Sequence, residues 1–167
     1  MKLKAKYAVG IAGLLCSLLV MASGGGGGSG GMGGGSSSGQ HGRVDWDAAM
    51  TAKVKVQLDA HAWDAALELL ATARAKEPDN ADWWNYTGYA QRKSGHLPEA
   101  FTAYKEALRL NPKHLGAHEY LGEAYLQNNQ PDQAREQLAQ LQGLCGNCEQ
   151  YQDLNEAVQD YTAKHPG

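Results

Sequence analysis

The stretch from 81 to 114 reads ADWWNYTGYAQRKSGHLPEAFTAYKEALRLNPKH and carries the strongest structural signal in the chain. Counted from Ala81, positions 4, 8, 10, 20, 24, 27 and 32 are Trp84, Gly88, Ala90, Ala100, Tyr104, Ala107 and Pro112. A 34-residue helix–turn–helix unit has this pattern, because small residues lie where the two helices cross and bulky residues fill the gaps between them. Such a unit builds a binding surface and performs no chemistry by itself.

The windows on either side continue the same spacing. Residues 115–148 keep it at Leu115, His118, Leu121, Gly122, Ala124, Tyr125, Ala134, Leu138 and Leu141. Residues 47–80 keep only the second half, at Ala66, Leu70, Ala73 and Pro78. An atypical first helix is expected of a terminal repeat, which has no predecessor to pack against.

A final amphipathic helix is predicted over residues 149–165. Apolar side chains recur there at three- and four-residue intervals, namely Tyr151, Leu154, Val158 and Tyr161. The sequence therefore predicts an all-α fold over 46–165. It is a right-handed stack of three repeats (47–80, 81–114, 115–148), which together occupy 46–148, followed by a capping helix. Trp63 and Trp84 are expected in its core, with Trp83 facing the preceding repeat.

The N-terminal segment has the pattern of a signal peptide over residues 1–22. Three lysines (Lys2, Lys4 and Lys6) precede a mostly apolar run from 7 to 21, and Ala22 offers a cleavage site. The run is about 15 residues, shorter than the roughly 20 that span a bilayer. We expect cleavage and a periplasmic or secreted protein; the alternative is an uncleaved anchor that holds the protein at the inner membrane, facing the periplasm.

Residues 23–45 are rich in glycine and serine, a composition that cannot bury enough surface to fold and predicts a disordered, low-complexity linker. Removal of 1–22 takes away three lysines and no acidic residue, so the net charge falls from −3 to about −6. No basic stripe remains, and nucleic acid is therefore not an expected partner. A membrane is expected to be one only if the N-terminal segment stays uncleaved.

Cys145 and Cys148 are the only cysteines outside the predicted signal peptide. A pair of cysteines in an exported protein suggests a disulfide, here within a four-residue turn. Two alternatives use the same turn. One is thiol redox exchange, although no βαβ pattern accompanies the pair. The other is a metal site formed with His114 and His118, whose ligand types suit zinc.

The chain resembles the tetratricopeptide-repeat family over residues 47–148, most closely over 81–114. It is also similar to small exported bacterial repeat proteins that end in a two-cysteine turn followed by Glu-x-Tyr and a last helix, here Cys145 to Tyr151. The resemblance implies a groove, lined by the first helix of each repeat, that binds a peptide or protein. At the matching positions stand Lys55, Asn85, Tyr89, Arg92, Glu119, Glu123 and Leu126.

One subtype of the family, which clamps a carboxylate at the end of a peptide, does not match. Its lysine, asparagine and arginine positions are here Thr51, Lys55, Tyr86, Gly116 and Tyr120. No catalytic constellation, phosphate loop or cofactor fingerprint stands out either. The sequence thus predicts a non-enzymatic interaction module of the bacterial cell envelope that needs no cofactor; a thiol-redox or metal-binding protein is the alternative.

Overall fold

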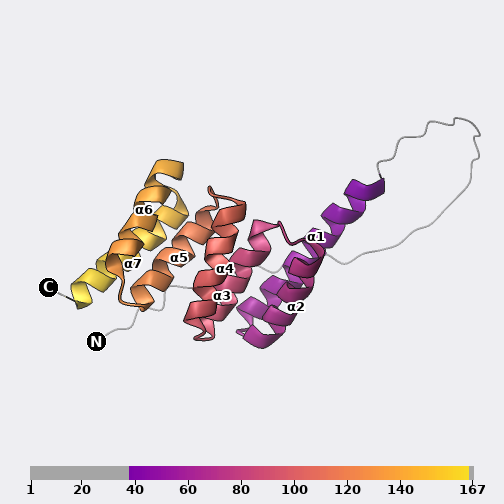
Figure 1. The fold of residues 1–167 in the computed structure, drawn as a ribbon, viewed down its shortest axis with the longest axis horizontal. Coiled ribbons are helices and arrows are strands. Elements are labelled where there is room, and N and C mark those ends of the chain that lie inside the picture. The colour runs from indigo at the N-terminus through magenta and orange to yellow at the C-terminus, as the bar shows by residue number, and fades with distance from the viewer. Residues whose placement is uncertain (1–37, 166–167) are drawn as a thin grey trace, which may run out of the picture. The chain divides into compact units, whose positions relative to one another are not determined.

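The computed structural model describes residues 38–165, which form seven α-helices and no strand. The helices are α1 (Ser38–Asp59), α2 (Trp63–Lys76), α3 (Ala81–Lys93), α4 (Leu97–Leu110), α5 (Leu115–Gln127), α6 (Pro131–Cys145) and α7 (Glu149–Lys164) (Figure 1). The predicted all-α repeat fold is confirmed. The predicted signal peptide lies outside the described residues, as does the linker up to residue 37.

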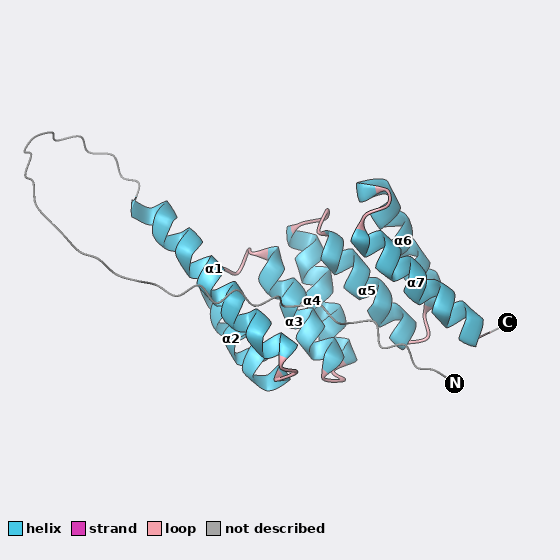
Figure 2. Cartoon of the chain, turned by 180° about the vertical axis from the view of Figure 1, so that it is seen from behind, coloured by secondary structure: helices cyan, strands magenta, loops and turns pink. Residues whose placement is uncertain are grey.

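The helices stack in chain order, each against the next, and Figure 2 shows the same order from behind. The first helices of successive repeats also meet, because α3 lies against α5 and α5 against α7. Helices α3 and α5 start at Ala81 and Leu115, the first residues of the second and third 34-residue windows. The repeat spacing therefore places equivalent residues at equivalent points of the stack.

The turn inside each repeat has one left-handed residue at the same position. His61, Gly95 and Asn129, each the fifteenth residue of its window, have φ of 55°, 90° and 55°. Glycine adopts this conformation without strain, and asparagine and histidine adopt it more readily than most residues. The turn geometry is thus kept in all three repeats although only one of them uses glycine.

Two glycines allow close helix crossings. A Cβ atom added to Gly88 would lie 2.5 Å from Cε1 of Tyr104, and one added to Gly122 would lie 2.5 Å from Cδ2 of Leu154. Tyr104 belongs to α4 of the same repeat, whereas Leu154 belongs to α7. The capping helix therefore supplies the side chain that fills the space over Gly122.

Gly88→Ala is expected to destabilise the protein, although alanine favours helix more than glycine does. The added methyl group meets the fully buried ring of Tyr104. Overpacking of about 1–3 kcal/mol should exceed the gain of about 1 kcal/mol in helix propensity. Gly143→Ala in α6 is the matched control, because a Cβ there meets nothing within 4 Å. Urea unfolding should show opposite signs for the two variants; a stabilised Gly88→Ala would contradict this crossing.

The core is a series of small clusters between neighbouring helices. One joins α1, α2 and α3 around Val54, Leu70 and Trp83, and another joins α5, α6 and α7 around Leu141 and Leu154. No single large core exists in the described part of the chain, as expected of a stack in which each unit covers only its neighbours.

The expectation that Trp84 lies in the core is wrong. Trp83 is the buried indole, 1% exposed, and it contacts Trp46 of α1 edge to face at 6.2 Å. Trp84 is only half-buried, with the guanidinium of Arg74 4.5 Å above its ring. Trp83, the residue before Trp84, faces the preceding repeat as predicted, and Trp46 of α1 is its aromatic partner there. Trp63 packs against the same cluster, partly buried.

Helix α1 begins at Ser38, so its first eight residues lie within the predicted linker. A helix nucleated by the packed side chains from Trp46 onward can extend toward its N-terminus, since each further residue adds a hydrogen bond without a new nucleus.

Among the described residues, none of the helices is both long and apolar enough to cross a bilayer.

Candidate functional site

The candidate site is the surface formed by α3, α5 and α7, called here the first-helix face. Of the residues predicted to line a groove, Asn85, Tyr89 and Arg92 come from α3, and Glu119, Glu123 and Leu126 come from α5. The structure brings Tyr89, Arg92, Glu119 and Glu123 together, as described below. Lys55 stands apart from them on α1, exposed to solvent.

Arg92 is the centre of this face. Its guanidinium is buried, with 2% of the side chain exposed, and its Nη2 lies 2.5 Å from Oε2 of Glu123. Its Nε donates a hydrogen bond of 3.4 Å to the hydroxyl of Tyr104. The guanidinium carbon also lies 5.8 Å and 5.7 Å from the ring centres of Tyr89 and Tyr120. A buried charge that is paired and hydrogen-bonded is held in one orientation.

Glu119 lies beside this pair without a partner of its own. Its side chain is 6% exposed, and no hydrogen bond or ion pair reaches its carboxyl group within residues 38–165. Burial raises the pKa of Glu119 to about 8, and the nearby acidic groups Glu123 and Asp153 add to the shift, while Arg92 opposes it. At neutral pH the carboxyl group therefore holds its proton much of the time.

A row of aromatic rings runs along the stack from His61 to Tyr120, and Arg92 lies beside its last two rings. The ring centres of His61 and Trp63 are 5.1 Å apart, those of Trp63 and Tyr89 are 6.3 Å apart, and those of Tyr89 and Tyr120 are 5.2 Å apart. The rings of Trp63, Tyr89 and Tyr120 are all partly exposed. They offer flat, rigid surface to a partner at low conformational cost.

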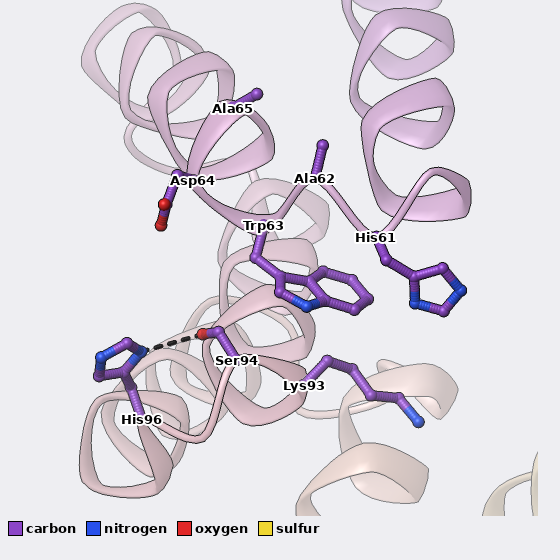
Figure 3. Close-up of a pocket in the computed structure, with 8 residues that line it drawn as sticks. All are labelled: His61, Ala62, Trp63, Asp64, Ala65, Lys93, Ser94 and His96. Atoms are coloured by element: carbon purple, nitrogen blue, oxygen red, sulfur yellow. Dashed lines mark hydrogen bonds between the residues drawn. The ribbon is translucent and has the colours of Figure 1, made fainter.

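A surface pocket of about 680 Å³ adjoins the far end of this aromatic row (Figure 3). Its lining comes from the turn after α1, the start of α2, the end of α3 and the turn that follows α3, and consists of His61, Ala62, Trp63, Asp64, Ala65, Lys93, Ser94 and His96. Figure 3 shows the Trp63 indole facing the pocket between His61 and the Ser94–His96 pair, whose side chains are 3.0 Å apart. Lys93 also lies 5.5 Å from the ring centre of Tyr89, so the pocket and the row share this lysine.

Four predicted groove residues are buried, namely Asn85, Arg92, Glu119 and Leu126. Leu126 is 8% exposed and packs with Leu141 and Leu154 beneath the face, because α6 and α7 both cover its side of α5. Asn85 is 6% exposed, and its Oδ1 is buried without a hydrogen-bond partner. Leu126 is thus a core residue, which corrects its placement in the groove.

The alternative metal site does not form. His114 is fixed elsewhere: its Nδ1 accepts a hydrogen bond from the backbone N–H of Ala117, and its Nε2 donates to Asp82 at 2.9 Å. This hydrogen bond from His114 lowers the pKa of Asp82. His118 lies against Gln137 and the carbonyl oxygen of Pro112. Within the described part of the chain, no three side chains of the kind that ligate metals come together.

Cys145 and Cys148 are bonded to each other, with their Cα atoms 5.7 Å apart. The bond closes the turn between α6 and α7, where Gly146 has a φ of 71°. Glycine permits this backbone conformation, which few other residues adopt. The predicted disulfide is therefore present and links the last repeat to the capping helix.

Sequence reasoning missed the contributions of Trp63 and Tyr120 to the candidate site. Trp63 was expected only in the core, and Tyr120 was considered only as a position of the carboxylate clamp, which it does not match. The acidic residues Glu149 and Asp153 of α7 were also missed, since a capping helix has no counterpart in the repeat pattern. The sequence did offer one signal for Tyr120, because it is an aromatic residue one helical turn from the predicted groove residue Glu123.

Two family models, both described as tetratricopeptide repeat, match residues 51–114 and 91–158. Together they span 51–158, well over half of the chain. The protein belongs to the tetratricopeptide-repeat family. No curated protein sequence matches it at a significant level.

Solved structures share the fold of this tetratricopeptide-repeat protein. The first such domain of Spaghetti (RPAP3), bound to an HSP90 peptide, superposes with a TM-score of 0.61 at 15% identity, covering 69% of this chain and 91% of that one. The TPR2B domain of yeast Sti1, in a complex with pHsp70, gives 0.64 at 15%, covering 70% and 96%. PcrH with the chaperone-binding region of PopD gives 0.63 at 16%, covering 72% and 94%.

Proposed function

We propose that this protein is a non-catalytic interaction module that holds a peptide or protein partner against its first-helix face. The observation that carries the proposal is the cluster of Tyr89, Tyr120 and Arg92, fixed by the Arg92–Glu123 ion pair. The few residues that dominate the binding energy at protein interfaces are enriched in tyrosine, tryptophan and arginine. The partly exposed rings of Trp63, Tyr89 and Tyr120 stand in one row that crosses three repeats, so an extended segment could contact them together, while the buried Arg92 lies beside the two tyrosine rings.

The structural neighbours support a partner of this kind. Three of them were solved with peptides or partner segments bound, from HSP90, Hsp70 and PopD. The chemistry of this chain points to a different ligand from a peptide with a terminal carboxylate, since the clamp residues are replaced by Thr51, Lys55, Tyr86, Gly116 and Tyr120.

The proposed location is the bacterial cell envelope, on the periplasmic side. It rests on the N-terminal pattern of Lys2, Lys4 and Lys6 before an apolar run, together with the disulfide between Cys145 and Cys148, which persists in oxidising compartments. Cell fractionation and N-terminal sequencing of the native protein test this point. A mature chain that starts at Ser23 in the periplasm supports export, and a cytoplasmic chain that starts at Met1 overturns it.

Site-specific photo-crosslinking in intact cells tests the binding face. Benzoylphenylalanine at position 89 keeps an aromatic ring in the row, and the same group at the exposed Thr102 of α4 is the control. We expect a discrete crosslinked partner from position 89 and none from position 102. Equal crosslinking at both positions, or none at either, would contradict the proposed face.

A further inference from the structure

The side chain of Glu119 is unusual among the buried acidic groups of the protein. Glu77 is buried to a similar extent, at 7% exposed, but accepts hydrogen bonds from Nε1 of Trp83 and Nδ2 of Asn80, both 3.1 Å long. Glu119, at 6% exposed, has no such donor in the part of the chain that the structure describes. Burying a polar group without a hydrogen bond costs stability, and the carboxyl oxygens of Glu119 are not among the fully enclosed atoms of the described residues, so a donor from a ligand could reach and complete them.

The charged groups around Glu119 come from all three helices of the first-helix face. On α5 they include Glu123, on α7 they are Asp153 and Glu149, and on α3 the only positive group among them is Arg92. Tyr120 of α5 is also within electrostatic reach. Arg92 is already paired with Glu123. The surroundings of Glu119 therefore hold more negative than positive charge and would attract a cation.

We infer that Glu119, with Asp153 and Glu149 beside it, forms a subsite for a basic side chain of a peptide bound on the first-helix face. This rests on the proposed function, which it deepens by naming the chemistry of the partner. Arginine should bind better than lysine, because a guanidinium group can donate to two carboxylates at once. The stem of that arginine would lie near the rings of Tyr89 and Tyr120, which lie 5.2 Å apart.

Ligand binding should be linked to the protonation of Glu119. A cationic side chain favours the ionised carboxylate, so it lowers the pKa of Glu119 and binds more tightly once that proton is lost. The pKa of about 8 for the free protein places this change between pH 6 and pH 9. The other groups that face Glu119 are Glu123, Asp153, Glu149, Arg92 and Tyr120, and substitution of Glu119 separates its contribution from theirs.

The test uses the mature chain, an acetylated and amidated triarginine peptide, and the matched tricitrulline peptide, which has the same shape without charge. NMR of the glutamate side-chain carboxyl carbons follows the titration of Glu119. We expect triarginine to lower the titration midpoint of Glu119 and to bind roughly tenfold more tightly at pH 9 than at pH 6. Tricitrulline should do neither.

Two variants with the same change of charge decide the assignment. Glu119→Gln should weaken triarginine binding about tenfold at pH 9 and abolish its pH dependence, whereas Glu68→Gln on the exposed surface of α2 should alter neither. Equal binding of triarginine to both variants, or equal binding of the two peptides, would overturn the subsite. If a partner crosslinks at position 89 but triarginine leaves the titration midpoint of Glu119 unchanged, the subsite is rejected and the proposed function stands. If triarginine lowers that midpoint but no partner crosslinks at position 89, the proposed function is rejected instead.

Discussion

Glu119→Gln is expected to raise the free energy of unfolding at pH 9 and to leave it nearly unchanged at pH 5. The pKa of Glu119 rises from an ordinary 4.5 to about 8 in the folded protein, first because of burial and then because of Glu123 and Asp153. Between these two values the folded chain holds a proton that the unfolded chain has lost. The stability that this proton provides is complete below pH 4.5 and is lost as the pH rises through 8.

Glutamine carries no ionisable proton, so the variant escapes this loss. At about 1.4 kcal/mol per pH unit, the shift from 4.5 to about 8 corresponds to a difference between variant and parent of up to about 5 kcal/mol at pH 9. Urea unfolding at pH 5, 7 and 9 measures it. Glu68→Gln is the control and should follow the parent at each pH. Parallel pH profiles for the parent and Glu119→Gln would show that Glu119 titrates as an exposed carboxylate does.

Leu154→Ala is expected to lower the free energy of unfolding by about 2–5 kcal/mol. Leu154 is fully buried, and its two methyl groups occupy the space left open by Gly122 of α5. The cavity left by the alanine substitution can close only if α5 or α7 moves. The same side chain packs with Leu126 and Leu141, so its loss weakens the contacts that hold the capping helix.

Gln159→Ala is the control for Leu154→Ala, since Gln159 is exposed on the same helix and should change stability by less than about 0.5 kcal/mol. Hydrogen exchange of the amides of α7, compared with those of α3, shows where the effect is felt. Faster exchange in α7 than in α3 is expected. A loss below about 1 kcal/mol with uniform exchange would mean that α7 is held mainly by other contacts, such as the Cys145–Cys148 disulfide.

Much of the fold was predictable because the repeat pattern is geometric. Gly88 and Tyr104 had to face each other once their offsets of 8 and 24 were recognised, and the structure places them in contact. The left-handed turn residues at His61 and Asn129 were not predicted, since only Gly95 carries the usual signal for that conformation. Tertiary packing there holds non-glycine residues in a conformation that they seldom adopt alone.

The candidate site was less predictable than the fold. Spacing shows which residues share one helix face, so Tyr89 with Arg92 and Glu119 with Glu123 could be grouped from the sequence. Spacing does not show how closely two neighbouring helices pack, and it is the close packing of α3 and α5 that lets Arg92 reach Glu123. The burial of Leu126 likewise depends on α7, which lies outside the repeat pattern.

The position of the tryptophans determines what a spectroscopist will see of this protein. All four (Trp46, Trp63, Trp83 and Trp84) lie between residues 46 and 84, in α1, α2 and α3. Indole emission therefore reports the N-terminal half of the stack, whereas far-ultraviolet circular dichroism reports every helix. In a stack held by nearest-neighbour contacts, the two signals coincide only if the whole array unfolds as one unit. A difference between their midpoints would show the C-terminal half melting on its own, unseen by fluorescence.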